Sequence, residues 1–298
     1  VFELLNNERA NCGFGKRSQN VLLDKAAQAH ADYIALNNLP TGHYETQGVP
    51  GFTGTTGGER ITATGYNFSY ADENIATQGW GSWYTSPHFG PLNFSLVEQS
   101  ATKNLRELLS SVYHMRSLLG QTTEIGIGVS THLDAEASSK TLNINTGVPF
   151  GTSSVGQQIP MDALATYPCN GVKDAFPYFG PEDPNPFPAL NLRFTPYGQP
   201  VYLMSSRGTT LSLISWSITK QGGMGVPVTV LTKDNDPQKR LSSNMVFVTP
   251  TQMLAENSTY DVAVTGTNTG MITANNPTGT FTRKFSFSTG IGYAPSTY

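Results

Sequence analysis

Charged side chains are scarce in this 298-residue chain. Lys, Arg, Asp and Glu make up 13% of it, about half of the roughly 25% that soluble domains carry. Basic and acidic residues nearly balance, at 18 against 21, so no basic excess exists to neutralise phosphates. Nucleic acid is therefore disfavoured as a partner. The weakly charged, Ser/Thr/Asn-rich composition favours an exported protein.

Long apolar runs are also missing. No stretch approaches the ~18 consecutive apolar residues of a membrane-spanning helix, so we expect no transmembrane segment. The chain starts at Val1 in an amphipathic stretch, and we expect a mature chain without a signal peptide. Disorder is disfavoured as well, because the net charge of −3 is small and 15 Phe and 13 Tyr residues can build cores.

Only two cysteines are present, Cys12 and Cys169. They are too few for a disulfide-dense scaffold, whereas one bridge is possible. From spacing alone, a Cys12–Cys169 bridge and two separate buried thiols both stay open. A bridge would fit an exported protein, because disulfides persist in oxidising compartments.

Helical periodicity dominates the first 120 residues. Apolar side chains recur at three- and four-residue steps from Leu23 to Ile34, with Asn20 as an N-cap and Pro40 as a stop. A second apolar stripe predicts a helical stretch over about 97–119. The segment between them contains many Gly and Thr residues and is expected to be irregular.

Beyond residue 120 the pattern becomes strand-like. Glu124–Ser130 and Leu142–Thr146 alternate like the two strands of a hairpin, so helices and paired strands together predict an α+β class. Residues 166–188 hold six prolines, which resist helix and sheet, and are predicted to be a linker. Later strands are expected at regular spacing, as in a β-sandwich: Val201–Ser205, Thr210–Ile218, Val226–Leu231, Met245–Thr249, Tyr260–Thr265 and Phe281–Ser288.

Two of the five histidines stand out as chemical groups. His43 follows the first predicted helix, and His114 lies seven positions after Glu107, on the same face if the second helix is continuous. Glu73 falls in the irregular segment between them. If they converge, these residues could bind a divalent cation or form an acid–base pair. Loop histidines and helix-surface glutamates without a shared site are the alternative.

Short motifs run in a fixed order through residues 2–146. They are Asn7-x-Arg9, Leu23-Asp24, Ala29-His30-Ala31-x-Tyr33, His43, Phe52-Thr53-Gly54, Glu73-Asn74-Ile75, Ser111-x-x-His114-x-x-x-Leu118 and Ile125-Gly126-Ile127-Gly128. This ordered set resembles the bacterial branch of the CAP superfamily, which comprises the cysteine-rich secretory proteins, antigen 5 and pathogenesis-related 1 proteins. The resemblance implies an α-β-α sandwich with a central cavity that carries a His/Glu tetrad, sometimes occupied by a metal ion.

The resemblance assigns His43, Glu73 and His114 to three members of that tetrad. The fourth, an acidic residue, is less clear. Its usual position falls near Arg106, and Glu107 is one residue later, a shift that rotates a helical side chain by about 100°. Glu45 is an alternative. The resemblance also implies a possible zinc, magnesium or calcium ion, with His43 and His114 as the candidate ligands.

Two further activities can be weighed from the same segment. Ser111 lies three residues before His114, but nothing supplies an oxyanion hole, so a serine mechanism is disfavoured. The family also binds lipids or sterols in hydrophobic grooves, and the aromatic-rich stretch 79–89 could line such a groove. These aromatic side chains could instead pack onto the core or, through Trp80 and Trp83, form a protein-contact patch.

The last strands, over Leu254–Gly290, resemble those of bacterial Ig-like domains on secreted and surface proteins. We therefore expect a CAP domain over residues 1–165, a proline-rich linker over 166–188 and an all-β Ig-like sandwich over 189–298.

Three functions follow from this organisation. The first is binding or interaction at the cell exterior, with an extracellular protein, a cell-surface component, a lipid or a second copy as partner, and enzymatic activity is not expected. The second is metal-dependent hydrolysis of peptide or cell-wall material. The third is a structural subunit of an extracellular assembly.

Overall fold

The structure is a computed structural model that describes residues 1–81, 95–133, 137–152 and 159–292. Most of the aromatic-rich stretch, including Trp83, lies outside the described residues. The chain forms two compact units, described here separately. Unit 1 comprises Val1–Asn7, Lys16–Leu108 and Gly120–Gln157, and unit 2 comprises Glu8–Gly15, Leu109–Leu119 and Gln158–Tyr298. No helix in these described ranges is long and apolar enough to cross a membrane.

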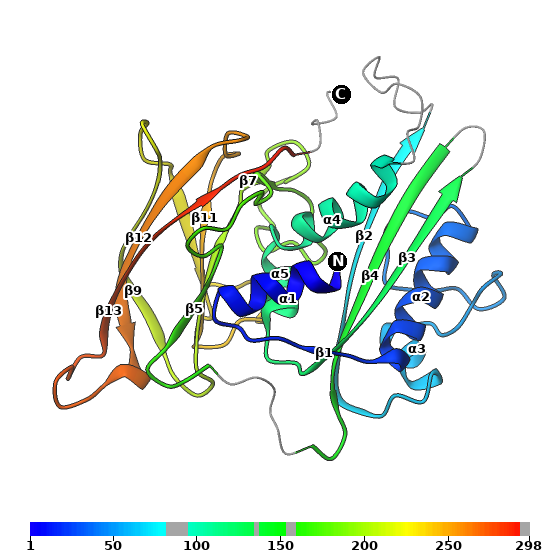
Figure 1. Cartoon of the computed structure of the whole chain (residues 1–298), viewed down its shortest axis with the longest axis horizontal. Coiled ribbons are helices and arrows are strands. Elements are labelled where there is room, and N and C mark those ends of the chain that lie inside the picture. The colour runs from blue at the N-terminus through cyan, green and yellow to red at the C-terminus, as the bar shows by residue number, and fades with distance from the viewer. Residues whose placement is uncertain (82–94, 134–136, 153–158, 293–298) are drawn as a thin grey trace. The chain divides into compact units, whose positions relative to one another are not determined.

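Unit 1 is a four-stranded sheet between helices. The strands, in spatial order, are β1 (Ser18–Gln19), β3 (Glu124–Leu133), β4 (Ala137–Pro149) and β2 (Phe68–Gly81). β3 and β4 form the predicted antiparallel hairpin, and β2 pairs antiparallel with β4. Helix α2 (Val21–Leu36) packs on β3 and β4, and α4 (Ser95–Leu108) packs on β2 and β4 from the other face (Figure 1). The result is the α-β-α layering that the resemblance implies.

Two glycines let α2 approach the sheet closely. A Cβ at Gly126 would lie 2.0 Å from the backbone of Leu23, and one at Gly128 would lie 2.2 Å from that of Ala27. Neither position can therefore carry a side chain unless the helix moves. The helix begins as predicted, because the Asn20 side chain accepts a hydrogen bond from a backbone N–H in the first turn of α2.

Three local predictions are wrong. The stretch 97–119 is not one helix but α4 and a separate α5 (Val112–Leu119), so Glu107 and His114 do not share a helix face. The irregular segment contains helix α3 (Gly57–Ala63), and Glu73 lies on strand β2 rather than in a loop. By contrast, the amphipathic N-terminal stretch is helical, as α1 (Phe2–Asn11).

Unit 2 contains two antiparallel sheets (Figure 1). The first has the order β10 (Val228–Thr232), β11 (Met245–Pro250), β8 (Val201–Ser205) and β5 (Leu164–Tyr167). The second has the order β13 (Thr280–Ser288), β12 (Thr259–Asn268) and β9 (Leu211–Lys220). Every predicted C-terminal strand is present, most with ends moved by one to three residues. A short pair, β6 (Tyr178–Phe179) and β7 (Tyr197–Gly198), completes the unit.

The proline-rich segment 166–188 packs within unit 2. Phe176 and Phe179 are buried, and Cys169 forms a disulfide with Cys12 across a Cα–Cα distance of 5.3 Å. Aromatic side chains between the prolines thus anchor the segment. The bridge itself is confirmed, whereas the division at residues 165 and 188 stays a prediction.

Candidate functional site

His43 and Glu73 meet in unit 1. His43 lies in the loop after α2, and its Nδ1 is 3.0 Å from Oε1 of Glu73 on β2. The Glu73 side chain is 7% exposed, whereas that of His43 is 35% exposed. A buried carboxylate therefore orients a partly exposed imidazole, and two residues that the sequence singled out lie together.

The Glu73 carboxylate has two more partners. Nη2 of Arg60, on α3, donates to both carboxylate oxygens at 2.9 and 2.7 Å, and Nδ2 of Asn143, on β4, donates to Oε2 at 3.1 Å. Burial alone would raise the pKa of Glu73, but the hydrogen bond from His43 and the charges of Arg60 and His30 lower it to about 2. Glu73 is thus ionised at neutral pH.

Glu45 forms a second buried group beside this pair. Its Oε1 is 2.9 Å from Nδ1 of His30, and its Oε2 accepts the backbone N–H groups of Thr53 and Gly54 at 2.6 and 3.3 Å. The other ring nitrogen of His30 is 2.9 Å from the carbonyl oxygen of Gly42. His30 is therefore a buried histidine with both nitrogens engaged, and Glu45 is its partner.

His114 belongs to unit 2, at the start of α5. Its Nδ1 is 2.8 Å from Oγ of Ser111 and 2.9 Å from Oε1 of Glu182. Glu182 also accepts the backbone N–H groups of Tyr113 and His114, both at 2.8 Å, and so caps the helix. Ser111 and Glu182 share one ring nitrogen, whereas a serine relay needs the hydroxyl and the acid on opposite nitrogens.

A second polar cluster surrounds Tyr113. Its hydroxyl donates to Asp236, whose carboxylate also accepts the backbone N–H groups of Gln238, Arg240 and Leu241. Burial, followed by the hydrogen bond to Asp236, raises the pKa of Tyr113. The Arg240 guanidinium carbon lies 5.6 Å from the centre of the Tyr113 ring. The cluster fixes α5 within unit 2.

The predicted tetrad residues thus divide between the units. Unit 1 holds His43, Glu73, Glu45 and the half-buried Glu107 on α4, and unit 2 holds His114. Membership of Glu107 and His114 in a shared cavity stays a prediction. Within the described residues, no group of three or more His, Cys, Asp or Glu side chains is arranged to hold a metal ion.

The residues around Glu73 do not fit a divalent cation. Both Glu73 oxygens face the Arg60 guanidinium at hydrogen-bond distance, where a metal ion would need the same lone pairs at about 2.0–2.2 Å. No chemical step is therefore derived through a metal.

Sequence reasoning missed Arg60, Asn143 and Glu182. Arg60 lies on α3, and that helix had a signal: Thr56, three residues before Glu59, accepts the Glu59 N–H as a capping residue. Asn143 and Glu182 had no local signal, because only the fold brings them to their partners.

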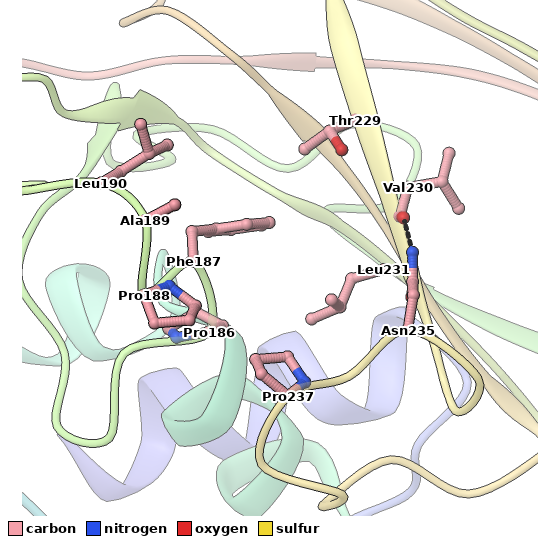
Figure 2. Close-up of a pocket in the computed structure, with 10 residues that line it drawn as sticks. All are labelled: Pro186, Phe187, Pro188, Ala189, Leu190, Thr229, Val230, Leu231, Asn235 and Pro237. Atoms are coloured by element: carbon pink, nitrogen blue, oxygen red, sulfur yellow. Dashed lines mark hydrogen bonds between the residues drawn. The ribbon is translucent and has the colours of Figure 1, made fainter.

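An apolar pocket of about 290 Å³ lies in unit 2. Phe187, from the loop before β7, and Leu231, from β10, point into it (Figure 2). The lining has no charged side chain: Pro186, Phe187, Pro188, Ala189, Leu190, Thr229, Val230, Leu231, Asn235 and Pro237. Its chemistry suits apolar contact rather than catalysis.

One family and several solved structures are similar to about half of the chain. The matching family over residues 2–146 is the cysteine-rich secretory protein family, CAP. An outer surface protein from Borrelia burgdorferi is a similar solved structure, with 17% identity, a TM-score of 0.34 and coverage of 50% of this chain and 89% of that one. An extracellular protein containing a SCP domain from Bacillus anthracis str. Ames has 20% identity, a TM-score of 0.29 and coverage of 47% and 38%. No curated protein matches. The family match and the α-β-α layering together identify residues 2–146 as a CAP domain.

Proposed function

We propose that this chain is an exported bacterial protein with a binding or interaction role at the cell exterior, built from a CAP domain and an Ig-like domain. The observation that carries the proposal is the strand order of unit 2. Constant-type Ig sandwiches have sheets in the order A-B-E-D and C-F-G. If β5 and β8 to β13 are labelled A to G in chain order, the observed sheets have these two orders.

Export is supported by the disulfide. The bridge between Cys12 and Cys169 spans a sequence separation of 157 residues, and closing so long a loop stabilises the folded state by roughly 5 kcal/mol on the chain-entropy account. Such a bridge persists in an oxidising compartment.

Binding is favoured over catalysis by the way both histidine sites are used. Arg60 and Asn143 donate hydrogen bonds to Glu73. Nδ1 of His114 contacts both Ser111 and Glu182. Each arrangement forms hydrogen bonds between polar groups and so fixes local structure, which is a stabilising role.

Hydrolysis is the second candidate, and one observation favours it. Glu73 accepts from Nδ1 of His43, as the acid of a catalytic relay orients its histidine base. His43 is partly exposed, so its other nitrogen could take a proton from water.

Sedimentation with bacterial cell envelopes distinguishes the binding role from the hydrolase. We expect the purified full-length protein to sediment with envelopes, and the His43→Ala variant to sediment equally well, because binding does not use His43. Release of soluble peptide or sugar fragments from the envelopes, abolished by His43→Ala, would instead establish the hydrolase. A protein that stays in the supernatant and releases nothing would contradict both.

A further inference from the structure

Two buried carboxylates in unit 1 share one buried guanidinium. Nη2 of Arg60 donates to both oxygens of Glu73, at 2.9 and 2.7 Å, and its Nε lies 3.7 Å from Oε1 of Glu45. The side chains of Arg60 and Glu45 are fully buried. Carboxylate oxygens are also ligands for zinc, magnesium and calcium, so the guanidinium occupies oxygens that a metal ion bound to Glu73 would need.

Other donors use the remaining capacity of these carboxylates. Glu73 also accepts from His43 and Asn143, at 3.0 and 3.1 Å. Glu45 accepts from the backbone N–H and the hydroxyl of Thr53, at 2.6 and 3.2 Å on the same oxygen. Each of the four carboxylate oxygens therefore already has at least one donor neighbour.

His30 also contacts this group. Its Nδ1 is 2.9 Å from Glu45 and its Nε2 is 2.9 Å from the carbonyl oxygen of Gly42. Both ring nitrogens of His30 are therefore engaged, and Oε1 of Glu45 has a partner besides Arg60.

We propose that Arg60 is the resident cation of the His43–Glu73 site and closes it to divalent metal ions. A metal ion could reach Glu73 only by displacing a guanidinium that also donates to the carbonyl oxygens of Gly54 and His43, at 3.1 and 2.9 Å. The displaced guanidinium would remain buried without its charge partner, which is strongly unfavourable. This assignment is independent of the proposed binding role, because it concerns side chains of unit 1 alone.

Zinc titration of the full-length protein tests whether Arg60 prevents metal binding at Glu73. With zinc chloride as the probe, we expect no rise in the melting temperature of the wild type. Any weak calorimetric heat should be the same in Glu73→Gln and in His43→Ala, which would assign it to other surface groups. One zinc ion bound per chain, and lost in Glu73→Gln, would overturn the assignment.

Removing the guanidinium gives the reciprocal test. Arg60→Met has a similar length but no charge, so the variant should be less stable and should gain at least about tenfold in zinc affinity. Zinc should then raise its melting temperature, because a ligand that binds only the folded state stabilises it. Arg60→Lys is the matched control: it keeps the positive charge and should not gain zinc affinity.

The double variant Arg60→Met/Glu73→Gln locates the ion. It should lose the zinc affinity gained by Arg60→Met. A folded Arg60→Met protein that binds zinc no better than the wild type would contradict the assignment. Should Arg60→Met fail to fold, the wild-type titration with Glu73→Gln as its control still decides between a closed and an open site.

Discussion

At the scale of single residues, the hydrogen-bond donors around Glu73 set the protonation state of this buried carboxylate in the CAP domain. Its carboxylate is buried, yet His43, Arg60 and Asn143 all donate to it. These contacts, which outweigh the opposing effect of burial, lower its pKa from 4.5 to about 2. Because the folded pKa is lower than the unfolded one, the ionised carboxylate stabilises the protein above the unfolded pKa, and this stability is lost as pH falls towards the folded pKa.

The Glu73→Gln variant should therefore show a pH-dependent loss of stability. At neutral pH we expect its free energy of unfolding to be about 3 kcal/mol lower than that of the wild type. The difference should shrink as pH falls from 4.5 towards 2, where the wild-type carboxylate also becomes protonated. Urea unfolding across this range measures it. A difference that stays constant with pH would contradict the ion-pair origin.

Tyr113 gives a second residue-scale prediction, in unit 2. Its buried hydroxyl donates to Asp236, and hydrogen bonds to charged groups contribute about 1.5–3 kcal/mol. Tyr113→Phe should lower the free energy of unfolding by about 2 kcal/mol, measured by urea unfolding at neutral pH. The exposed Tyr44 provides the control: Tyr44→Phe should change stability little. Equal effects of the two substitutions would show that the hydrogen bond from Tyr113 to Asp236 does not stabilise the folded protein.

At the scale of elements, periodicity identified structure where apolar side chains alternate regularly. Helix α2 and the strands of unit 2 have such patterns, and their positions were predicted closely. Strand β2 was missed because Asp72, Glu73 and Asn74 are poor strand formers in local terms. Pairing with β4 and the polar network around Arg60 hold them in the sheet. A local pattern does not encode such tertiary contacts. This is why the sequence did not predict strand β2 or the partners of Glu73, Arg60 and Asn143.

The contact between α2 and β3 carries the element-scale prediction. A methyl group at Gly128 would lie 2.2 Å from the backbone of Ala27, so Gly128→Ala should push α2 off the sheet and cost about 1–3 kcal/mol. Thermal unfolding measures the loss. Gly58→Ala is the control, because its nearest neighbour would be at 3.9 Å. A Gly128→Ala protein as stable as Gly58→Ala would mean that α2 lies farther from the sheet.

At the scale of the whole molecule, the two units are not consecutive stretches of chain. Residues 8–15 and 109–119 belong to unit 2, although the family match covers both. Local patterns predicted a division at residue 165 because they show where helices give way to strands. They do not show which distant segments pack together.

Truncation tests how far the CAP domain depends on unit 2. A protein of residues 1–157 lacks Cys169, the partner of Cys12, and Glu182, which caps α5 at Tyr113 and His114. We expect this fragment to lose cooperative thermal unfolding and near-ultraviolet circular dichroism, whereas the full chain keeps both. A fragment with a sharp transition and dispersed amide resonances would instead show that residues 2–146 fold independently.

Scarce charge gives the last prediction at this scale. With 13% charged residues and a net charge of −3, little like-charge repulsion opposes self-association. Strand β9 is a sheet edge without a charged residue from Leu211 to Thr219, and Ile214 and Trp216 on it are 63% and 41% exposed. Apolar edges of this kind pair readily with other strands.

Residues 225 and 226 cover only the end of β9, where Gly225 pairs with Thr219 and the backbone N–H of Val226 donates to the carbonyl oxygen of Ile218. The β10 edge of the other sheet is partly covered as well. The Asn235 side chain accepts from the backbone N–H of Thr232 and donates to the carbonyl oxygen of Val230, as a neighbouring strand would do. If the chain assembles through unit 2, we expect it to use the part of β9 that carries the exposed Ile214 and Trp216. We expect light scattering to show a mass that rises with protein concentration, and Trp216→Lys to suppress the rise by placing a charge on that edge. Met224→Lys, on the exposed turn after β9, should leave association unchanged, whereas a wild type that is monomeric at every concentration would rule out the role of a structural subunit.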